Sequence, residues 1–348
     1  MTKHTIHLVN SLNISGSGGQ ALDLQSRIGP KCLVAALSGS LMTAEKTRPG
    51  LMRRGRWLRF SPSQNEQFGF YSLYSMLKRN HVHTLFAHDL TALHAALFPA
   101  RLAGVSSIYG IVNSTDELNR KAFRIGLGLR MRSSTVQILV GNIASQNALR
   151  TYWPNLPCKT LKPGVDLQRF QPGNKIAARK KVNIPIDCTL IGTALTLEKG
   201  YGLEKLLEAL FRLPASTHLA IAGQGEYLLH FQSAASELGI GHRVHFLGWQ
   251  PESALFYQAL DLFCQPKQTF SHTLLEAQAC GIPVVAMNRA GCDEACCPIT
   301  GYLAEPDSAT SLAETVKQAL SRQLTRSPRL HMEQHHDMNK MFQALRAR

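Results

Sequence analysis

Short apolar segments alternate with helix-like segments along almost the whole of this 348-residue chain. A parallel pair of strands needs a long crossover, so strands that alternate with helices are typical of a parallel sheet covered on both faces. In the first half, we predict strands over residues 4–10, 32–37, 82–87, 105–109 and 136–140, and helices over 67–79 and 116–132. The pattern predicts an α/β fold.

The alternation stops at the turn Pro163-Gly164-Val165-Asp166 and resumes after the charged stretch 175–181. We predict strands over 189–195, 218–222, 243–247, 262–265 and 283–287, and helices over 202–210, 227–238, 251–260 and 272–280. A chain of this length exceeds what one hydrophobic core usually organises. We therefore expect two Rossmann-like domains with an interdomain cleft, and ligands beyond the carboxyl ends of the strands.

No apolar run approaches the roughly 18 residues needed to cross a bilayer, and polar residues follow the start too soon for a secretory leader. These features predict a cytoplasmic protein. The eight cysteines are scattered, which favours reduced, mostly buried thiols. Cys292, Cys296 and Cys297 lie close in sequence but lack a second Cys or His pair at zinc spacing, so we predict no metal site.

The positive charge is concentrated in the first half of the chain. Residues 1–165 contain 20 Lys and Arg against 6 Asp and Glu, whereas the remainder contains 18 against 17. This asymmetry indicates a half that contacts polyanions. Because no zinc finger, aromatic RNA-binding signature or basic zipper is present, we do not expect nucleic acid to be the partner.

Two stretches, residues 46–59 and 118–132, hold much of this charge. In the second, Leu118, Ala122, Ile125 and Leu129 recur at helical spacing, with the basic residues off that line. One interpretation is a surface helix that packs its apolar line on the sheet and exposes a solvated basic face. The other is that both stretches contact an anionic membrane surface, the inner face of the cytoplasmic membrane.

The second half contains five motifs in a fixed order. They are GTALTLEKGYGLEKLLEAL, AGQGEYLLHFQSAASELG, HRVHFLGW, PKQTFSHTLLEAQACGIPVVA and NRAGCDEACCPITGYLAEPDS, preceded by the link KPGVDLQRFQP. Together they resemble the retaining glycosyltransferases of the GT-B fold, family 4 (glycosyl transferases group 1). The resemblance is good over residues 140–320. It implies domains at 1–165 and 166–329, with the last segment, 330–348, packing back on the first.

The resemblance implies a nucleotide-sugar site on the second domain. The N–H groups that open the helix after Phe270, together with the helix dipole, would hold a diphosphate. Lys199 would neutralise charge on the leaving diphosphate, and Glu276 would accept hydrogen bonds from the ribose. The other implied contacts are Gly18, Gly19, Ser271, His272, Thr273 and Glu294 around the nucleotide, Gln268 near the sugar, and Asp89, Tyr109 and Asn113 on the acceptor side.

Three positions depart from the family pattern. Gln268 replaces the first of two glutamates, Ala194 stands where the family has an arginine, and Tyr109 aligns with a strand-end histidine. Front-side attack needs neither a protein nucleophile nor a general base, because the departing phosphate takes the acceptor's proton and positioning dominates. The scheme requires no cofactor and no metal.

The function implied is retaining transfer of a sugar from a UDP- or GDP-sugar donor to a glycan or lipid-linked acceptor, in cell-envelope polysaccharide or lipopolysaccharide biosynthesis. The alternative is a catalytically degenerate GT-B protein that acts as a binding or scaffold component. Gln268 and Ala194 motivate that alternative.

Overall fold

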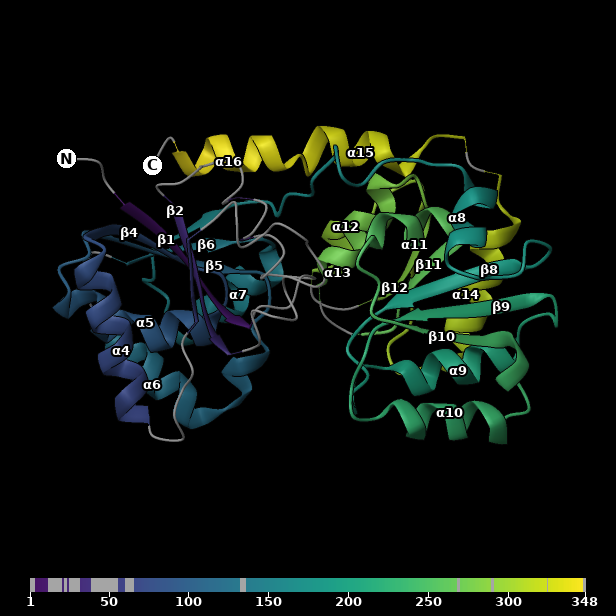
Figure 1. Ribbon diagram of the computed structural model, residues 1–348, viewed down its shortest axis with the longest axis horizontal. Coiled ribbons are helices and arrows are strands. Elements are labelled where there is room, and N and C mark those ends of the chain that lie inside the picture. Colours follow the sequence, from purple (N-terminus) through teal and green to yellow (C-terminus); the bar gives the residue numbers. More distant parts are fainter. Residues whose placement is uncertain are drawn as a thin grey trace. The chain divides into compact units, whose positions relative to one another are not determined.

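The computed structural model describes residues 4–11, 21, 24, 32–38, 56–59, 66–131, 136–267, 270–288, 291–323 and 325–346. The chain divides into two compact units (Figure 1). Unit 1 is Met1–Pro163 with Met341–Arg348, and unit 2 is Gly164–Lys340.

Unit 1 is built on a seven-stranded sheet in the order β3-β2-β1-β4-β5-β6-β7, and all of its described pairings are parallel. The strands are β1 (His4–Ser11), β2 (Cys32–Ser38), β3 (Arg56–Arg59), β4 (Val82–Ala87), β5 (Ser107–Val112), β6 (Val136–Val140) and β7 (Cys158–Thr160). The helices are α4 (Glu66–Arg79), α5 (Leu90–Leu102), the 3-10 helix η1 (Asp116–Asn119), α6 (Lys121–Met131) and α7 (Ile143–Tyr152). Of the basic stretch 46–59, only 56–59 are described, as β3.

Helices α4, α5 and α6 lie together on one side of this sheet (Figure 1). Their buried side chains form one core with alternate residues of β1 and β2 and with three residues of β4. Asp89 begins α5 as its N-cap, accepting from the amide of Ala92 at 2.6 Å. The parallel α/β architecture predicted from the alternation is confirmed in this unit.

Helix α6 does not pack on the sheet through its apolar line. In the first of the two interpretations, Leu118, Ala122, Ile125 and Leu129 pack on the sheet. In the structure Leu118 belongs to η1 and is buried, but Ile125 and Leu129 are 55% and 63% exposed. Leu127 is fully buried in their place.

Two glycines explain why α6 packs by this face. A Cβ on Gly126 would lie 2.9 Å from Nε2 of His94, and a Cβ on Gly128 would lie 2.7 Å from Nε1 of Trp153. The helix therefore approaches its neighbours most closely through positions without side chains, which an apolar-periodicity argument does not register.

Unit 2 has a six-stranded parallel sheet in the order β10-β9-β8-β11-β12-β13. Its strands are β8 (Thr189–Ala194), β9 (Thr217–Ala222), β10 (Val244–Gly248), β11 (Leu262–Gln265), β12 (Val284–Met287) and β13 (Gly301–Ala304). Its helices are α8 (Lys175–Lys181), α9 (Leu203–Phe211), α10 (Leu228–Glu237), the 3-10 helix η2 (Gly241–Arg243), α11 (Ser253–Ala259), α12 (His272–Ala279), α13 (Cys292–Ala295), α14 (Ala309–Ser321) and α15 (Pro328–His335).

Strand residues of unit 2 alternate between two cores. Ile191, Leu219 and Val285 pack with α9, α10 and α14. Their neighbours Leu190 and Ala220 pack on the opposite face with α8, α11, α12 and α13. Burial on both faces explains why these strands are continuous apolar runs, and it leaves the loops at the carboxyl ends to supply polar groups.

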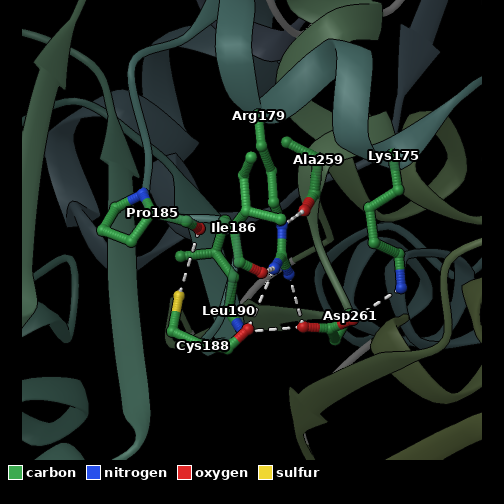
Figure 2. A network of polar contacts seen from close by, with 8 residues as sticks. All are labelled: Lys175, Arg179, Pro185, Ile186, Cys188, Leu190, Ala259 and Asp261. Carbon is green, nitrogen blue, oxygen red and sulfur yellow. Dashed lines mark hydrogen bonds and ion pairs between the residues drawn. The ribbon is translucent and has the colours of Figure 1, made fainter.

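An ion-pair network fastens α8 to the other end of this sheet (Figure 2). The Arg179 guanidinium is buried and donates to carbonyls of Ala259, Ile186 and Cys188 at 2.6–2.9 Å and to Oδ2 of Asp261 at 2.7 Å. The same Oδ2 accepts from the amide of Leu190 at 2.7 Å. One buried cation thus connects α8 to the segments that begin β8 and β11.

The carboxyl-terminal division differs from the predicted one at 330. Helix α15 stays with unit 2, because Arg329 donates to the carbonyls of Phe170, Ala279 and Leu167 at 2.8–3.1 Å. Beyond it α16 (Met338–Arg346) begins, and the chain joins unit 1 from Met341.

None of the helices in the described part of the chain combines the length and the apolar character that spanning a bilayer requires. Six of the eight cysteine side chains are buried, which confirms the prediction of mostly buried thiols.

Candidate functional site

Two loops meet at the carboxyl edge of the unit 2 sheet. The first follows β8 and carries Lys199, and the second follows β11 and leads to α12. Gly202 adopts a φ of +79°, and a Cβ there would lie 2.4 Å from the carbonyl oxygen of Pro266. Only glycine allows this backbone approach, so the sequence brings the Lys199 loop directly against the loop that precedes α12.

Lys267 adds a second cation at this edge, which sequence reasoning missed. Its ammonium nitrogen lies 4.6 Å from the centre of the Tyr201 ring. Burial, followed by the Asp293 carboxylate, raises the pKa of Cys292 to about 12, and the positive charge of Lys267 opposes that rise. Lys267 therefore lies near both the β8 loop and α13. Its sequence signal is a basic residue two positions after the end of a buried strand.

A chain of hydroxyl groups fixes the start of α12. Ser271 is the N-cap, and its Oγ accepts from the amide of Thr273 at 3.4 Å. Oγ of Ser271 also lies 2.7 Å from Oγ1 of Thr273, which donates to Oε1 of Gln265 at 3.2 Å. Both hydroxyl protons are consequently directed inward, and the helix start presents backbone amides and its dipole to an anion. Gln265, the polar last residue of β11, was not among the predicted residues.

His272 is the first residue of α12, and its side chain is buried. Burial, with the nearby His336 as a smaller cause, lowers the pKa of His272 to about 4. The imidazole is therefore neutral at pH 7. His272 would contribute to an anion site through its backbone and not through charge.

Glu276 lies one turn further along α12, and its carboxylate is held by a buried tyrosine. The Tyr257 hydroxyl, from α11, donates to Oε2 of Glu276 at 2.6 Å. Burial and the Glu276 charge raise the pKa of Tyr257 well above its ordinary value, so the phenol remains a donor. Sequence reasoning selected Glu276 but not Tyr257, which is 19 residues away on another helix.

The remaining predicted residues fall into two groups. Lys199 and Glu294 are exposed, Lys199 in the loop after β8 and Glu294 on α13. Gln268, Gly18 and Gly19 lie outside the described residues.

The acceptor-side candidates of unit 1 occupy different environments. The Asp89 carboxylate accepts from two backbone amides, of Ala92 and of Asn10 at 3.1 Å, and burial raises its pKa. Asn113 directly follows β5, and its carbonyl accepts from Nδ2 of Asn142 at 3.0 Å. Tyr109 is not at a strand end as expected. It lies inside β5, is buried, and stacks on Phe86 with ring centres 4.8 Å apart.

Chemically, the unit 2 edge combines a helix start, two lysines and an oriented carboxylate. This set can bind a diphosphate and accept hydrogen bonds from sugar hydroxyls. Within the described ranges, no group of three His, Cys, Asp or Glu side chains is arranged to hold a metal ion.

Comparisons with known proteins show what the unit 2 part of the chain is similar to. Residues 174–340 match the family model described as glycosyl transferases group 1. Among curated proteins, a D-inositol 3-phosphate glycosyltransferase of Mycolicibacterium smegmatis is 33% identical over 173 residues, covering 46% of this chain and 39% of that protein. One of Mycobacterium leprae is 36% identical over 133 residues, covering 36% and 31%. The chain thus matches well under half of the length of these relatives.

Solved structures resemble the whole chain. HepE of Anabaena, solved in complex with UDP-glucose, superposes with a TM-score of 0.85 at 17% identity, over 99% of this chain and 98% of that one. WaaG, a glycosyltransferase involved in lipopolysaccharide biosynthesis, gives a TM-score of 0.77 at 16% identity, over 98% of both chains. At these identities the likeness shows the fold, and it confirms the predicted α/β class with two GT-B-type domains.

Proposed function

Residues 174–340 belong to the glycosyl transferases group 1 family, and on that premise we propose that this protein transfers a sugar from a nucleoside diphosphate sugar to a hydroxyl acceptor with retention. The observation that carries the proposal is the start of α12, where Glu276 follows the helix opening by one turn and is oriented by Tyr257. An anion at the helix start and a ribose at the carboxylate match the two polar parts of a nucleoside diphosphate.

Positioning and charge stabilisation supply the rate enhancement in this proposal. The donor diphosphate lies at the amides that open α12, and Lys199 neutralises the charge that develops on it as the glycosidic bond breaks. Ala194, where the family has an arginine, leaves room for a second cation, and Lys267 supplies that charge from the neighbouring loop. The departing phosphate takes the acceptor's proton, so no side chain acts as a base.

We also propose a glycan or lipid-linked acceptor, used in building the cell envelope at the inner face of the cytoplasmic membrane. Two observations support this placement. The fold resembles that of WaaG, a glycosyltransferase involved in lipopolysaccharide biosynthesis. The excess positive charge is concentrated in residues 1–165, ahead of the residues that match the family model.

Titration calorimetry with UDP, GDP and UDP-glucose tests the donor site. We expect one of these to bind the parent protein and Glu276→Gln to weaken that binding about tenfold or more, because a neutral amide is a poorer acceptor for two ribose hydroxyls. Glu237→Gln, an exposed change at the end of α10, is the matched control. If neither nucleotide nor sugar nucleotide binds, and donor hydrolysis is absent, the scaffold alternative motivated by Gln268 and Ala194 replaces the enzyme.

Tyr257→Phe tests how the carboxylate is oriented. Because the phenol donates to a charged oxygen, its removal is expected to raise the donor Kd about tenfold, or ~1.4 kcal/mol, with a smaller change in kcat. Tyr302→Phe is a matched control, since Tyr302 is buried in the same unit and its hydroxyl has no hydrogen-bond partner among the described residues. Equal donor affinities for the two variants would contradict a positioning role for Tyr257.

A further inference from the structure

Helix α6 of unit 1 presents an outward line of residues that its packing does not use. This line, the α6 stripe, consists of Lys121, Ala122, Ile125 and Leu129. All four are exposed, Ile125 at 55% and Leu129 at 63%. Large aliphatic side chains exposed one turn apart on a helix indicate a surface that binds a partner or a membrane.

Residues on the other sides of α6 hold the helix in place. Phe123 lies 5.0 Å from the His94 ring of α5, measured between ring centres, and Leu127 is buried in the unit 1 core. On the remaining side, the Arg124 guanidinium lies 4.5 Å from the centre of the Tyr152 ring. Because these contacts fasten α6 on three sides, the stripe can be changed without removing core contacts.

The neighbouring helices also carry exposed apolar side chains. Helices α4, α5 and α6 form one layer on the sheet (Figure 1). In that layer Phe98 and Leu102 of α5 are 52% and 56% exposed, and Tyr71 of α4 is 67% exposed. The exposed apolar groups therefore recur across the layer and are not confined to one helix turn.

The sequence that contains the stripe is strongly basic, and the nearest acidic residues before it are Asp116 and Glu117 of η1. Residues 118–165 contain eight Lys and Arg and no Asp or Glu, and Arg120 and Lys121 at the start of α6 are exposed. Apolar side chains flanked by cations on one helix match the boundary between the headgroups and acyl chains of an anionic bilayer. A second copy of this chain is disfavoured as the occupant, because an isologous contact would bring these cations together.

We propose that the α6 stripe docks unit 1 on an anionic phospholipid bilayer. Ala122, Ile125 and Leu129 enter the interface between headgroups and acyl chains, while Arg120 and Lys121 contact the phosphates. This assigns a surface to the membrane location given in the proposed function, and it requires no donor. Donor binding and membrane docking can therefore fail independently.

Co-sedimentation of the full chain with vesicles tests the docking. We expect binding to phosphatidylcholine vesicles that contain about 30% phosphatidylglycerol, binding about tenfold weaker to pure phosphatidylcholine, and a decline with added salt. Ile125→Ser combined with Leu129→Ser is expected to weaken the first binding about tenfold, and Arg120→Gln with Lys121→Gln several-fold.

Leu229→Ser provides the matched control, because Leu229 is 78% exposed on α10 of unit 2, and it should leave vesicle binding unchanged. Thermal melts and nucleotide titrations of every variant separate docking from folding and from the donor site. Three results would overturn the proposal: parent-like vesicle binding by the double serine variant, equal binding to both vesicle types, or a dimer in solution that the double serine variant dissociates while vesicles bind neither protein.

Discussion

Replacement of Lys199 by alanine is expected to lower the rate of sugar transfer about 100- to 1000-fold while leaving the fold intact. Lys199 is exposed in the loop that follows β8, and the contact of Gly202 with Pro266 places this loop against the one that opens α12. Removing one preorganised donor to a leaving group typically costs about 2.7–4 kcal/mol in the transition state. An exposed lysine in a loop contributes little to stability, so the change is expected in kcat rather than in the melting temperature.

The measurement is single-turnover transfer or hydrolysis of whichever nucleotide sugar binds. Lys317→Ala is the matched control, since Lys317 is a half-exposed lysine in an i,i+3 pair with Glu314 on α14. It is expected to leave turnover unchanged. Parent-like turnover by Lys199→Ala would remove Lys199 from the diphosphate role, and Lys267 would then be the residue to change next.

Replacement of Arg179 by methionine is expected to lower the free energy of unfolding by about 3 kcal/mol. Methionine fills much of the volume of the arginine stem, so the loss isolates the polar contacts. The guanidinium is buried and serves three carbonyls as well as Asp261. Without it those oxygens lose their donors in a site from which water is largely excluded, which is far more costly than losing a surface ion pair.

Urea denaturation, compared with that of Lys175→Ala, measures this effect. Lys175 pairs with the other Asp261 oxygen at 2.6 Å, but its side chain is 48% exposed, so its removal is expected to cost at most about 1 kcal/mol. A loss below 1 kcal/mol for Arg179→Met would show that the network in Figure 2 contributes little to stability.

Continuous runs of apolar residues were enough to predict the central strands of both sheets, because strands buried on both faces must be apolar throughout. For example, every residue of β11 and of β12 is buried. Short edge strands escaped the prediction. β7 has three residues, none of them buried, and β3 lies in a basic stretch, so neither has the run of apolar residues that marks a buried strand.

Within the candidate site, local motifs selected residues at the start of α12 and Lys199 in the loop after β8, but they did not select Tyr257 or Lys267. Ser271, Thr273 and Glu276 follow one another along one helix, so their spacing fixes their arrangement. Tyr257 contacts Glu276 from another helix, and a single sequence does not reveal such proximity. The same limit applies to Arg179 and Asp261, which are 82 residues apart.

In the proposed function, the hydroxyls of Ser271 and Thr273 affect how tightly a donor binds and not which donor is preferred. Because the two hydroxyls contact each other and Thr273 donates to Gln265, the diphosphate site that we propose at the start of α12 is formed before a donor binds. This site contacts only the diphosphate, which all nucleoside diphosphate sugars share, so it should bind them alike. Selectivity for one base or one hexose must then come from groups beyond the helix opening, and changes confined to Ser271 or Thr273 should alter how tightly all donors bind without altering which one is preferred.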